Sequence, residues 1–212
     1  MACRKLKKDK VMVQVRTEIL FPTKHGVCKL YSFKGLSDSK EHIALIFGDG
    51  NINKTPLVRI HSECKTGDVF GSKLCDCGEQ LNEAVSLFSK RGGIIIYLQQ
   101  EGRNIGLYNK IDTYAIQAKG YDTYEANEIL NFPRDARDFK VAAEILIALG
   151  IKKIKLLSNN PKKYEQLIEN GIDIVSRKNT NLYINNENKN YLEAKIKKGG
   201  HIFNFNCCKE AL

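Results

Sequence analysis

The sequence lacks any apolar run close to the roughly 20 residues that a membrane-spanning helix needs. Its first ten residues, MACRKLKKDK, are basic and no apolar segment follows them, so they do not resemble a secretory signal. It also lacks an internal repeat, an interdomain linker and any known nucleic-acid-binding motif. These absences predict a cytoplasmic protein without a membrane partner, whose cysteines are free or metal-bound rather than paired in disulfides.

Acidic residues are the scarcer charged class. The chain has 24 Asp and Glu against 34 Lys and Arg, which gives a formal net charge of +10. Such a balance suits nucleic acid, a membrane surface or a small polyphosphate as partner. Most of the excess is lysine, spread along the chain among many asparagines, so a solvated basic surface explains it without a partner. We therefore expect no nucleic-acid partner.

Periodicity divides the chain into two parts. The first third has alternating or short apolar runs, which predict four strands with antiparallel connections. From Gln80 onward, helical spacing alternates with short apolar runs. The strands are expected at 11–21, 27–33, 43–47, 57–61, 94–98, 154–157 and 172–175. The helices are expected at 80–89, 107–119, 135–149, 161–171 and 191–198. A further short helix is expected to be capped by Asp122 or Thr123, and residues 179–190 are expected to form a loop.

The predicted fold class is α/β (α+β): a single domain with a mixed β-sheet, a β-rich N-terminal third and an alternating helix and strand C-terminal part. Hydrophobic residues make up 42% of the 212 residues, which is ordinary for one globular domain. We expect a flexible basic tail at 1–10, a catalytic domain at 11–200 and a C-terminal tail at 201–212.

Three of the seven cysteines form the strongest chemical signal. Ten residues separate Cys64 from Cys75, and one residue separates Cys75 from Cys77. Three thiolates can occupy three tetrahedral corners around zinc and leave the fourth for water, as in catalytic zinc sites. A helix N-terminus predicted at the second and third cysteines favours the thiolate form. The alternatives are a closed structural site with His61 as fourth ligand, or inert buried thiols. The other cysteines, expected to be free thiols, are Cys3, Cys28, Cys207 and Cys208.

Three weaker motifs each have an ordinary structural explanation. The segment 100–106 joins a strand to a helix, where backbone N–H groups and the Arg103 guanidinium can face an anion. The segment 157–163 offers a hydroxyl, a helix start and two lysines, but it also reads as an N-cap followed by surface lysines. The segment 134–138 is a charged helix start. Together with the cysteines, these motifs suggest an enzyme with a zinc-bound water and a phosphorylated substrate.

In this order and spacing, the sequence blocks resemble the GTP cyclohydrolase II family over roughly residues 11–203. The matching blocks are VRIHSECKTGDVFGSKLCDCGEQL, IYLQQEGRNIGLYNKI, YDTYEAN, RDARDF and LLSNNPKK. The resemblance implies zinc-dependent hydrolysis of GTP to formate, pyrophosphate and 2,5-diamino-6-ribosylamino-4(3H)-pyrimidinone 5′-phosphate, the first step of riboflavin biosynthesis. No region resembles the dihydroxybutanone-phosphate synthase domain that is often fused to this one, so a stand-alone form is expected.

The resemblance also implies roles for individual residues. Tyr114 matches the family's active-site tyrosine, Asp135 its proton acceptor and Arg137 its nucleophile. Arginine, whose guanidinium stays charged at neutral pH, is a poor nucleophile, and its chemistry suits stabilisation of charge on the phosphate. The implied ligands of one Zn²⁺ per chain are Cys64, Cys75 and Cys77. The positions that match GTP contacts are Arg59, Ile60, His61, Ser62, Glu63, Gln80, Glu101, Gly102, Arg103, Thr123, Ser158 and Lys163. Among these, Glu101 or Gln80 is expected to accept from the guanine. Magnesium on the triphosphate and a homodimer are implied as well.

Two positions depart from the family pattern. Gln99 stands where the family often has arginine, so one phosphate-side charge is absent, and Ser158 stands where threonine is usual. The stretch 179–212 is the least family-like part and is expected to be disordered or specific to this protein. Two other functions stay open: a relative with an altered product or another purine nucleotide substrate, and a zinc-stabilised nucleic-acid-binding module.

Overall fold

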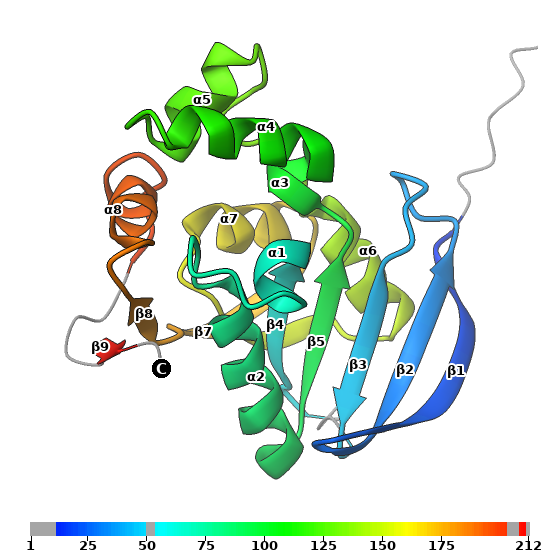
Figure 1. Cartoon of the computed structure of the whole chain (residues 1–212). Helices are drawn as coiled ribbons and strands as arrows, with labels where there is room; N and C mark the ends of the chain where they lie inside the picture. The colour runs from blue at the N-terminus through cyan, green and yellow to red at the C-terminus, as the bar shows by residue number, and fades with distance from the viewer. Residues whose placement is uncertain (1–11, 50–53, 203–207, 211–212) are drawn as a thin grey trace, which may run out of the picture.

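The computed structural model describes residues 12–49, 54–202 and 208–210 (Figure 1). The predicted basic tail at 1–10, Cys3 and Cys207 lie outside the described residues, as does the Cys208 side chain. Cys28 is a free thiol, as expected. Within the described residues, no helix is long and apolar enough to cross a membrane.

A seven-stranded mixed sheet forms the centre of the fold, which confirms the predicted class. The strands are β1 (Gln14–Thr23), β2 (Gly26–Lys34), β3 (Ile43–Phe47), β4 (Leu57–Ser62), β5 (Gly93–Leu98), β6 (Lys153–Leu157) and β7 (Asp173–Lys178). Their order is β1-β2-β3-β5-β4-β6-β7. The pairs from β1 to β5 are antiparallel, whereas β5, β4, β6 and β7 run parallel.

Helices cover both faces of this sheet. The helices of the described residues are α1 (Lys65–Asp68), α2 (Cys77–Arg91), α3 (Glu101–Asn104), α4 (Leu107–Gln117), α5 (Thr123–Ile129), α6 (Lys140–Ala148), α7 (Pro161–Glu169) and α8 (Lys189–Lys197), of which α2, α6 and α7 pack on the sheet. Phe88 of α2 packs in one cluster with Phe47 and Ile95 of the sheet. α6 and α7 pack in a larger cluster, where Ile145 and Leu167 meet the other face. Strand β5 is therefore buried on both sides, which explains its continuous apolar run.

Three sequence predictions are wrong in detail. β4 does not extend the antiparallel series, because β5 lies between it and β3. The helix expected from residue 135 begins only at Lys140, since the Asp135 and Asp138 carboxylates accept hydrogen bonds from backbone N–H groups two residues ahead and hold a non-helical turn. The expected loop at 179–190 contains β8 (Leu182–Ile184), which pairs with β9 (Cys208–Glu210). The stretch 179–202 thus carries β8 and α8 rather than disorder.

The parallel strands place their carboxyl ends at one edge of the sheet. Polar residues follow β4, β5 and β6 there, and α1, α3 and the start of α7 begin from the same edge. In Figure 1, α4 and α5 lie beyond this edge and α8 stands to one side of it. The carboxyl edge of a parallel sheet is where ligands usually bind in α/β proteins.

Candidate active site

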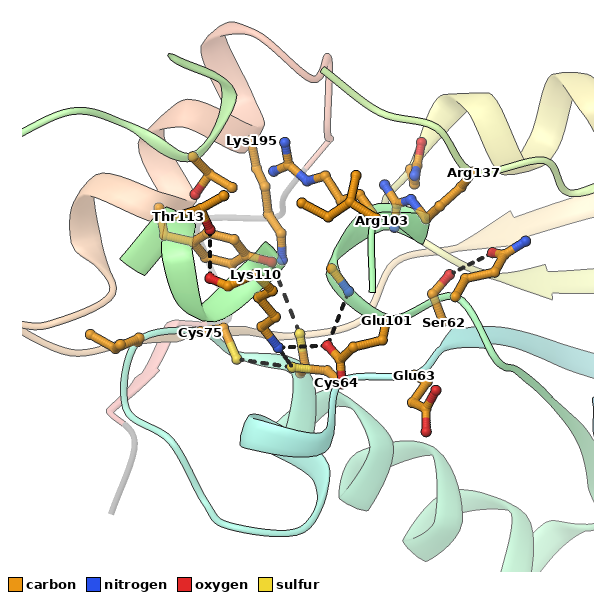
Figure 2. Close-up of a pocket in the computed structure, with 18 of the residues that line it drawn as sticks. Ser62, Glu63, Cys64, Cys75, Glu101, Arg103, Lys110, Thr113, Arg137 and Lys195 are labelled. Atoms are coloured by element: carbon orange, nitrogen blue, oxygen red, sulfur yellow. Dashed lines mark hydrogen bonds and ion pairs between the residues drawn. The ribbon is translucent and has the colours of Figure 1, made fainter. Parts of the chain in front are cut away.

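A pocket lies at the carboxyl ends of β4 and β5, where α2, α4, α5 and α8 contribute side chains to its wall (Figure 2). Most of the residues singled out from the sequence meet there. Those on the wall are Arg59, His61, Ser62, Glu63, Cys64, Cys75, Cys77, Gln80, Glu101, Gly102, Arg103, Tyr114, Thr123, Arg137 and Lys163. Segments far apart in the sequence therefore build one site.

Three predicted site residues lie behind the wall. The Ile60 carbonyl accepts a hydrogen bond from Lys163 Nζ at 2.7 Å. Ser158 Oγ accepts from the Asn160 backbone N–H at 3.1 Å, just before α7. Asp135 forms an ion pair with Arg137 at 2.6 Å. Each acts on the pocket through a neighbour. The side chain of Gln99 accepts from the backbone N–H of Glu41 and is not on the wall.

The three cysteines converge as the spacing predicts. Cys64 ends the segment after β4, and Cys75 and Cys77 stand at the start of α2. Their Sγ atoms all lie within 4.8 Å of one another, and Cys64 Sγ is 3.7 Å from Cys75 Sγ. Zinc–sulfur bonds of about 2.3 Å at tetrahedral angles place two sulfurs about 3.8 Å apart, so this donor set fits zinc.

His61 does not complete a closed structural site. Its Nε2 lies 3.1 Å from both carboxylate oxygens of Asp68. Asp68 also accepts from the Tyr97 hydroxyl at 2.8 Å and from the Cys64 backbone N–H at 2.9 Å. Burial lowers the pKa of His61, despite Asp68 beside it, so its ring is neutral. His61 and Asp68 therefore hold the turn that carries Cys64. The candidate metal ligands are the three cysteines, without His61.

Two glycines allow the cysteine-bearing turns to approach each other. A Cβ on Gly67 would lie 2.9 Å from Cys75 Sγ and 3.2 Å from Cys64 Sγ. A Cβ on Gly78 would lie 2.5 Å from the Gly67 carbonyl oxygen. Because that oxygen belongs to the backbone, any side chain at Gly78 forces the two turns apart.

We expect Gly78→Ala to weaken zinc binding on the order of tenfold or more, the size of effect seen when groups supporting metal ligands are disturbed. The helix itself should persist, since alanine is a good helix former. Competition with a chromogenic chelator measures the affinity. Asn82→Ala, on the exposed side of the same helix, is the matched control. Equal zinc affinity in Gly78→Ala and the control would contradict the close contact.

A buried lysine neutralises the cysteine cluster. Lys110 Nζ lies 3.1 Å from Cys64 Sγ and 2.8 Å from Glu101 Oε1. Hydrogen bonds from the other two thiols and the nearby lysine hold the pKa of Cys64 far below its ordinary value. Burial by itself lowers the pKa of Lys110, but the Cys64 thiolate and Glu101 outweigh it and raise that pKa. The site thus contains a stable cation beside a thiolate.

Tyr114 lies next to this group. Its hydroxyl is 3.0 Å from Thr66 Oγ1, which also accepts from Lys110 Nζ at 2.8 Å. Burial raises the pKa of Tyr114. The phenol therefore stays protonated at neutral pH, as a proton donor must.

Glu101 and the loop after β5 differ from the simple anion-binding turn that we expected. Both Glu101 oxygens are engaged, Oε1 by Lys110 and by the Gly102 N–H at 3.0 Å, and Oε2 by the Lys65 N–H at 2.7 Å. The N–H groups of Asn104, Ile105 and Gly106 bond within the loop. The backbone of Arg103 is left-handed (φ 59°), and its guanidinium lies 3.9 Å from the centre of the Tyr124 ring. The N–H groups of Gly102, Asn104, Ile105 and Gly106 are therefore engaged inside the loop, whereas the Arg103 side chain lies on the pocket wall.

Cations gather at the other end of the pocket. Arg137 donates to Asp135 from Nε at 2.9 Å and from Nη2 at 2.6 Å. Burial disfavours both charges, but the ion pair between the two side chains outweighs burial. The pKa of Asp135 is therefore lowered and the pKa of Arg137 is raised. Burial, then Arg59 and Arg137, hold the pKa of Lys163 well below its usual range. Burial and the two arginines therefore disfavour a further positive charge on Lys163, and a bound polyanion would favour it.

Sequence reasoning missed several wall residues. Lys110 precedes Tyr114 by four residues, so the two share a helix face, and this spacing was an available signal. Lys195 and Tyr191 come from α8, in the stretch judged least family-like. Arg59 Nε and His61 Nδ1 are buried without a partner among the described residues. Unpartnered buried nitrogens fit a site that a ligand completes.

Comparison with known proteins identifies relatives. The family model described as GTP cyclohydrolase II matches residues 14–179. A GTP cyclohydrolase-2 of Vibrio parahaemolyticus is 53% identical over 194 residues, covering 90% of this chain and 98% of the relative. One of Psychromonas ingrahamii is 51% identical over 198 residues, covering 92% and 99%. Riboflavin biosynthesis protein RibBA of Bacillus cereus is 45% identical over 194 residues, which cover 91% of this chain and 49% of that protein.

Proposed function

The chain belongs to the GTP cyclohydrolase II family and is a hydrolase, and from this membership we propose that it hydrolyses GTP to formate, pyrophosphate and 2,5-diamino-6-ribosylamino-4(3H)-pyrimidinone 5′-phosphate. This would be the first step of riboflavin biosynthesis. The observation that carries the proposal is one pocket with three converging thiols at one end and buried cations at the other. The reaction needs both, because it opens a ring and cleaves a phosphate anhydride in the same molecule.

At the thiol end, Cys64, Cys75 and Cys77 would hold one zinc ion. A zinc ion held there would supply activated water for attack on C8 of the guanine, the carbon between two nitrogens. One water opens the ring to a formamide, and a second water releases C8 as formate. Tyr114 is protonated and donates to the ring nitrogen that is released when the ring opens. Lys110 holds Glu101 and the Cys64 thiolate in place and offsets the negative charge of the thiolates.

The base would lie between these groups and β4. Gln80 Oε1 accepts from Arg59 Nη2 at 2.7 Å, which fixes the amide at the pocket wall. Arg59, His61, Ser62, Glu63 and Gln80 carry the nucleoside contacts in this proposal, with Thr123 across the pocket. Of the two guanine acceptors considered from the sequence, Gln80 is preferred, because its Oε1 accepts one hydrogen bond, from Arg59, whereas Glu101 already accepts three, from Lys110 and two backbone N–H groups.

At the cationic end, Arg103, Arg137 and Lys163 would bind the triphosphate together with Mg²⁺. We assign Arg137 to charge on the α-phosphate rather than to nucleophilic attack, because Asp135 stabilises its charged form. Asp135 is deprotonated, as a proton acceptor must be, but its low pKa makes it a weak base. Its first role here is to orient Arg137, and Ser158 supports the start of α7 behind Lys163.

The test is incubation of the zinc-loaded protein with GTP and Mg²⁺, with formate and pyrophosphate quantified together. We expect equal amounts of both. Pyrophosphate without formate would place the defect at the cysteines and Tyr114 and favour a relative with an altered product. Neither product from folded, zinc-bound protein would contradict the proposal, and steeply salt-dependent polynucleotide binding would then favour the nucleic-acid module.

Two further expectations belong to this proposal. The catalytic unit is taken to span residues 11–200, and the homodimer implied by the family resemblance is expected in solution. Sedimentation velocity of the full chain measures the second directly. A monomer that retains full turnover would remove dimerisation from the proposal without affecting the chemistry.

A further inference from the structure

The C-terminal helix α8 reaches into the pocket. Lys195 extends from α8 toward the cysteine-bearing turn (Figure 2), and its Nζ lies 2.6 Å from Asp76 Oδ1. Tyr191, one helical turn earlier, has its hydroxyl 4.0 Å from Cys77 Sγ. Both residues line the pocket, together with His201 just after the helix. No role was assigned to any of these three from the sequence.

Specific contacts hold the segment around α8 against the rest of the protein. The Asn181 backbone N–H donates to Glu83 of α2 at 3.0 Å. Lys198 pairs with Asp122 and Glu125 at the start of α5. The Ile202 backbone N–H donates to the Asn159 carbonyl at 3.0 Å. These contacts reach α2, α5 and the loop before α7, so the segment forms a wall of the pocket.

Lys195 adds a further cation to the pocket, next to the cysteine-bearing turn, and its charge also reaches Lys163. Lys195 is 8% exposed, and the charge of Arg137 acts on Lys163 as well. Asp76 and Asp135 offset part of this charge from positions behind the wall. Buried like charges repel one another, and an arrangement that retains them in a pocket fits a polyanionic ligand. The negative charge of a triphosphate would balance the positive charge that Asp76 and Asp135 leave uncompensated.

We propose that Lys195 is a substrate-binding residue whose ammonium group contacts the phosphate chain of the bound nucleotide, with α8 as the wall that carries it. The inference rests on the proposed function, because it takes a nucleoside triphosphate as the ligand. Without nucleotide, Asp76 holds the ammonium group at the edge of the pocket. A phosphate oxygen beside it gains a charge-assisted hydrogen bond and offsets the charges of Lys195 and Arg137 that act on Lys163.

Asp76 links this lysine to the rest of the site. It is completely buried, and its other carboxylate oxygen accepts from Gln80 Nε2 at 2.5 Å. Gln80 in turn accepts from Arg59. Lys195 therefore also anchors α8, so a test must separate its charge from its anchoring role. Lys195→Gln does this, because the amide keeps a donor for Asp76 and removes the charge, whereas Lys195→Met removes both.

The experiment is calorimetric titration of the zinc-loaded protein with inorganic tripolyphosphate and, separately, with guanosine. We expect Lys195→Gln and Lys195→Met to bind tripolyphosphate at least tenfold more weakly than wild type, with guanosine affinity changed less than twofold. Lys197→Met is the matched control, since its side chain is 72% exposed on the same helix and pairs only with Glu193 among the ion pairs of the described residues. It should bind both ligands as wild type does.

Unchanged tripolyphosphate affinity in a folded Lys195→Gln would overturn the inference, as would an equal loss of guanosine affinity. Turnover of GTP by the wild type is measured separately. If wild type releases formate while the Lys195 variants bind tripolyphosphate normally, this inference fails alone. If wild type releases no formate, yet tripolyphosphate binding depends on Lys195, the proposed function fails and the phosphate contact stands.

Discussion

Cys75→Ser should lose its zinc and, with it, all detectable release of formate from GTP. A serine hydroxyl stays protonated near neutral pH and is a poor zinc ligand, so the change leaves two thiolates where three converge. The distances favour this outcome, because Cys75 Sγ lies 3.7 Å from Cys64 Sγ and both side chains are buried. Zinc per chain is read by elemental mass spectrometry, and formate by a coupled dehydrogenase assay.

Cys28→Ser is the matched control for this prediction. Cys28 is a buried thiol of β2, and its Sγ lies 3.6 Å from the Phe21 carbonyl oxygen, so a serine hydroxyl finds an acceptor there. The control should keep both its zinc and its turnover. Both variants place a serine hydroxyl at a buried thiol position, so their melting temperatures should change by similar amounts when both proteins are measured without zinc. Full turnover in a zinc-free Cys75→Ser protein would remove the metal from the proposed chemistry.

The cysteine site shows which features of a site can be predicted from local sequence. Three thiols at this spacing, two of them beginning a helix, already limit the ligand type and count. The glycines that let the turns approach carry no such signal, because a glycine needed for turn geometry and one needed for close contact look alike in a sequence. Gly67 and Gly78 are recognisable only once the two turns are seen against each other.

The order of the strands shows the opposite case. Each strand of the sheet was predicted near its observed place, yet β4 was assigned to an antiparallel series. Its partners β5 and β6 come later in the chain, after α2 and after α6 respectively. Period-2 patterns report which residues are buried, but they carry no information on which strand lies alongside. The position of the pocket depends on that order, so it could not be derived from local patterns.

Lys195 shows why composition misleads. Lysine- and asparagine-rich sequence usually indicates a solvated surface, and most of the +10 charge fits that description. One lysine of α8 is nonetheless buried against Asp76, while Lys197 two residues later is exposed. Helical spacing alone separates inward from outward positions only when the neighbouring elements are known.

Arg137→Ala should lower pyrophosphate release at least a hundredfold while the protein stays folded and zinc-bound. Removing one preorganised donor at a developing charge typically costs 10²–10³ in rate. Arg137 is held in place by two hydrogen bonds to Asp135, so the group is preorganised. Arg134→Ala is the matched control: its side chain is 61% exposed, pairs with Glu128 and should not affect release. Pyrophosphate is measured by a coupled phosphatase assay, alongside zinc content.

Arg137→Lys separates the two roles considered for this residue. If a positive charge on the α-phosphate is what matters, lysine should recover part of the lost rate, although it cannot reproduce the paired contact with Asp135. If Arg137 attacks phosphorus, acid-quenched wild-type protein should carry a nucleotidyl group on the arginine, detectable by mass spectrometry. We expect no such adduct, because the guanidinium stays charged beside Asp135 and has no electron pair to offer. An adduct on Arg137 would establish nucleophilic catalysis and return Asp135 to the role of proton acceptor.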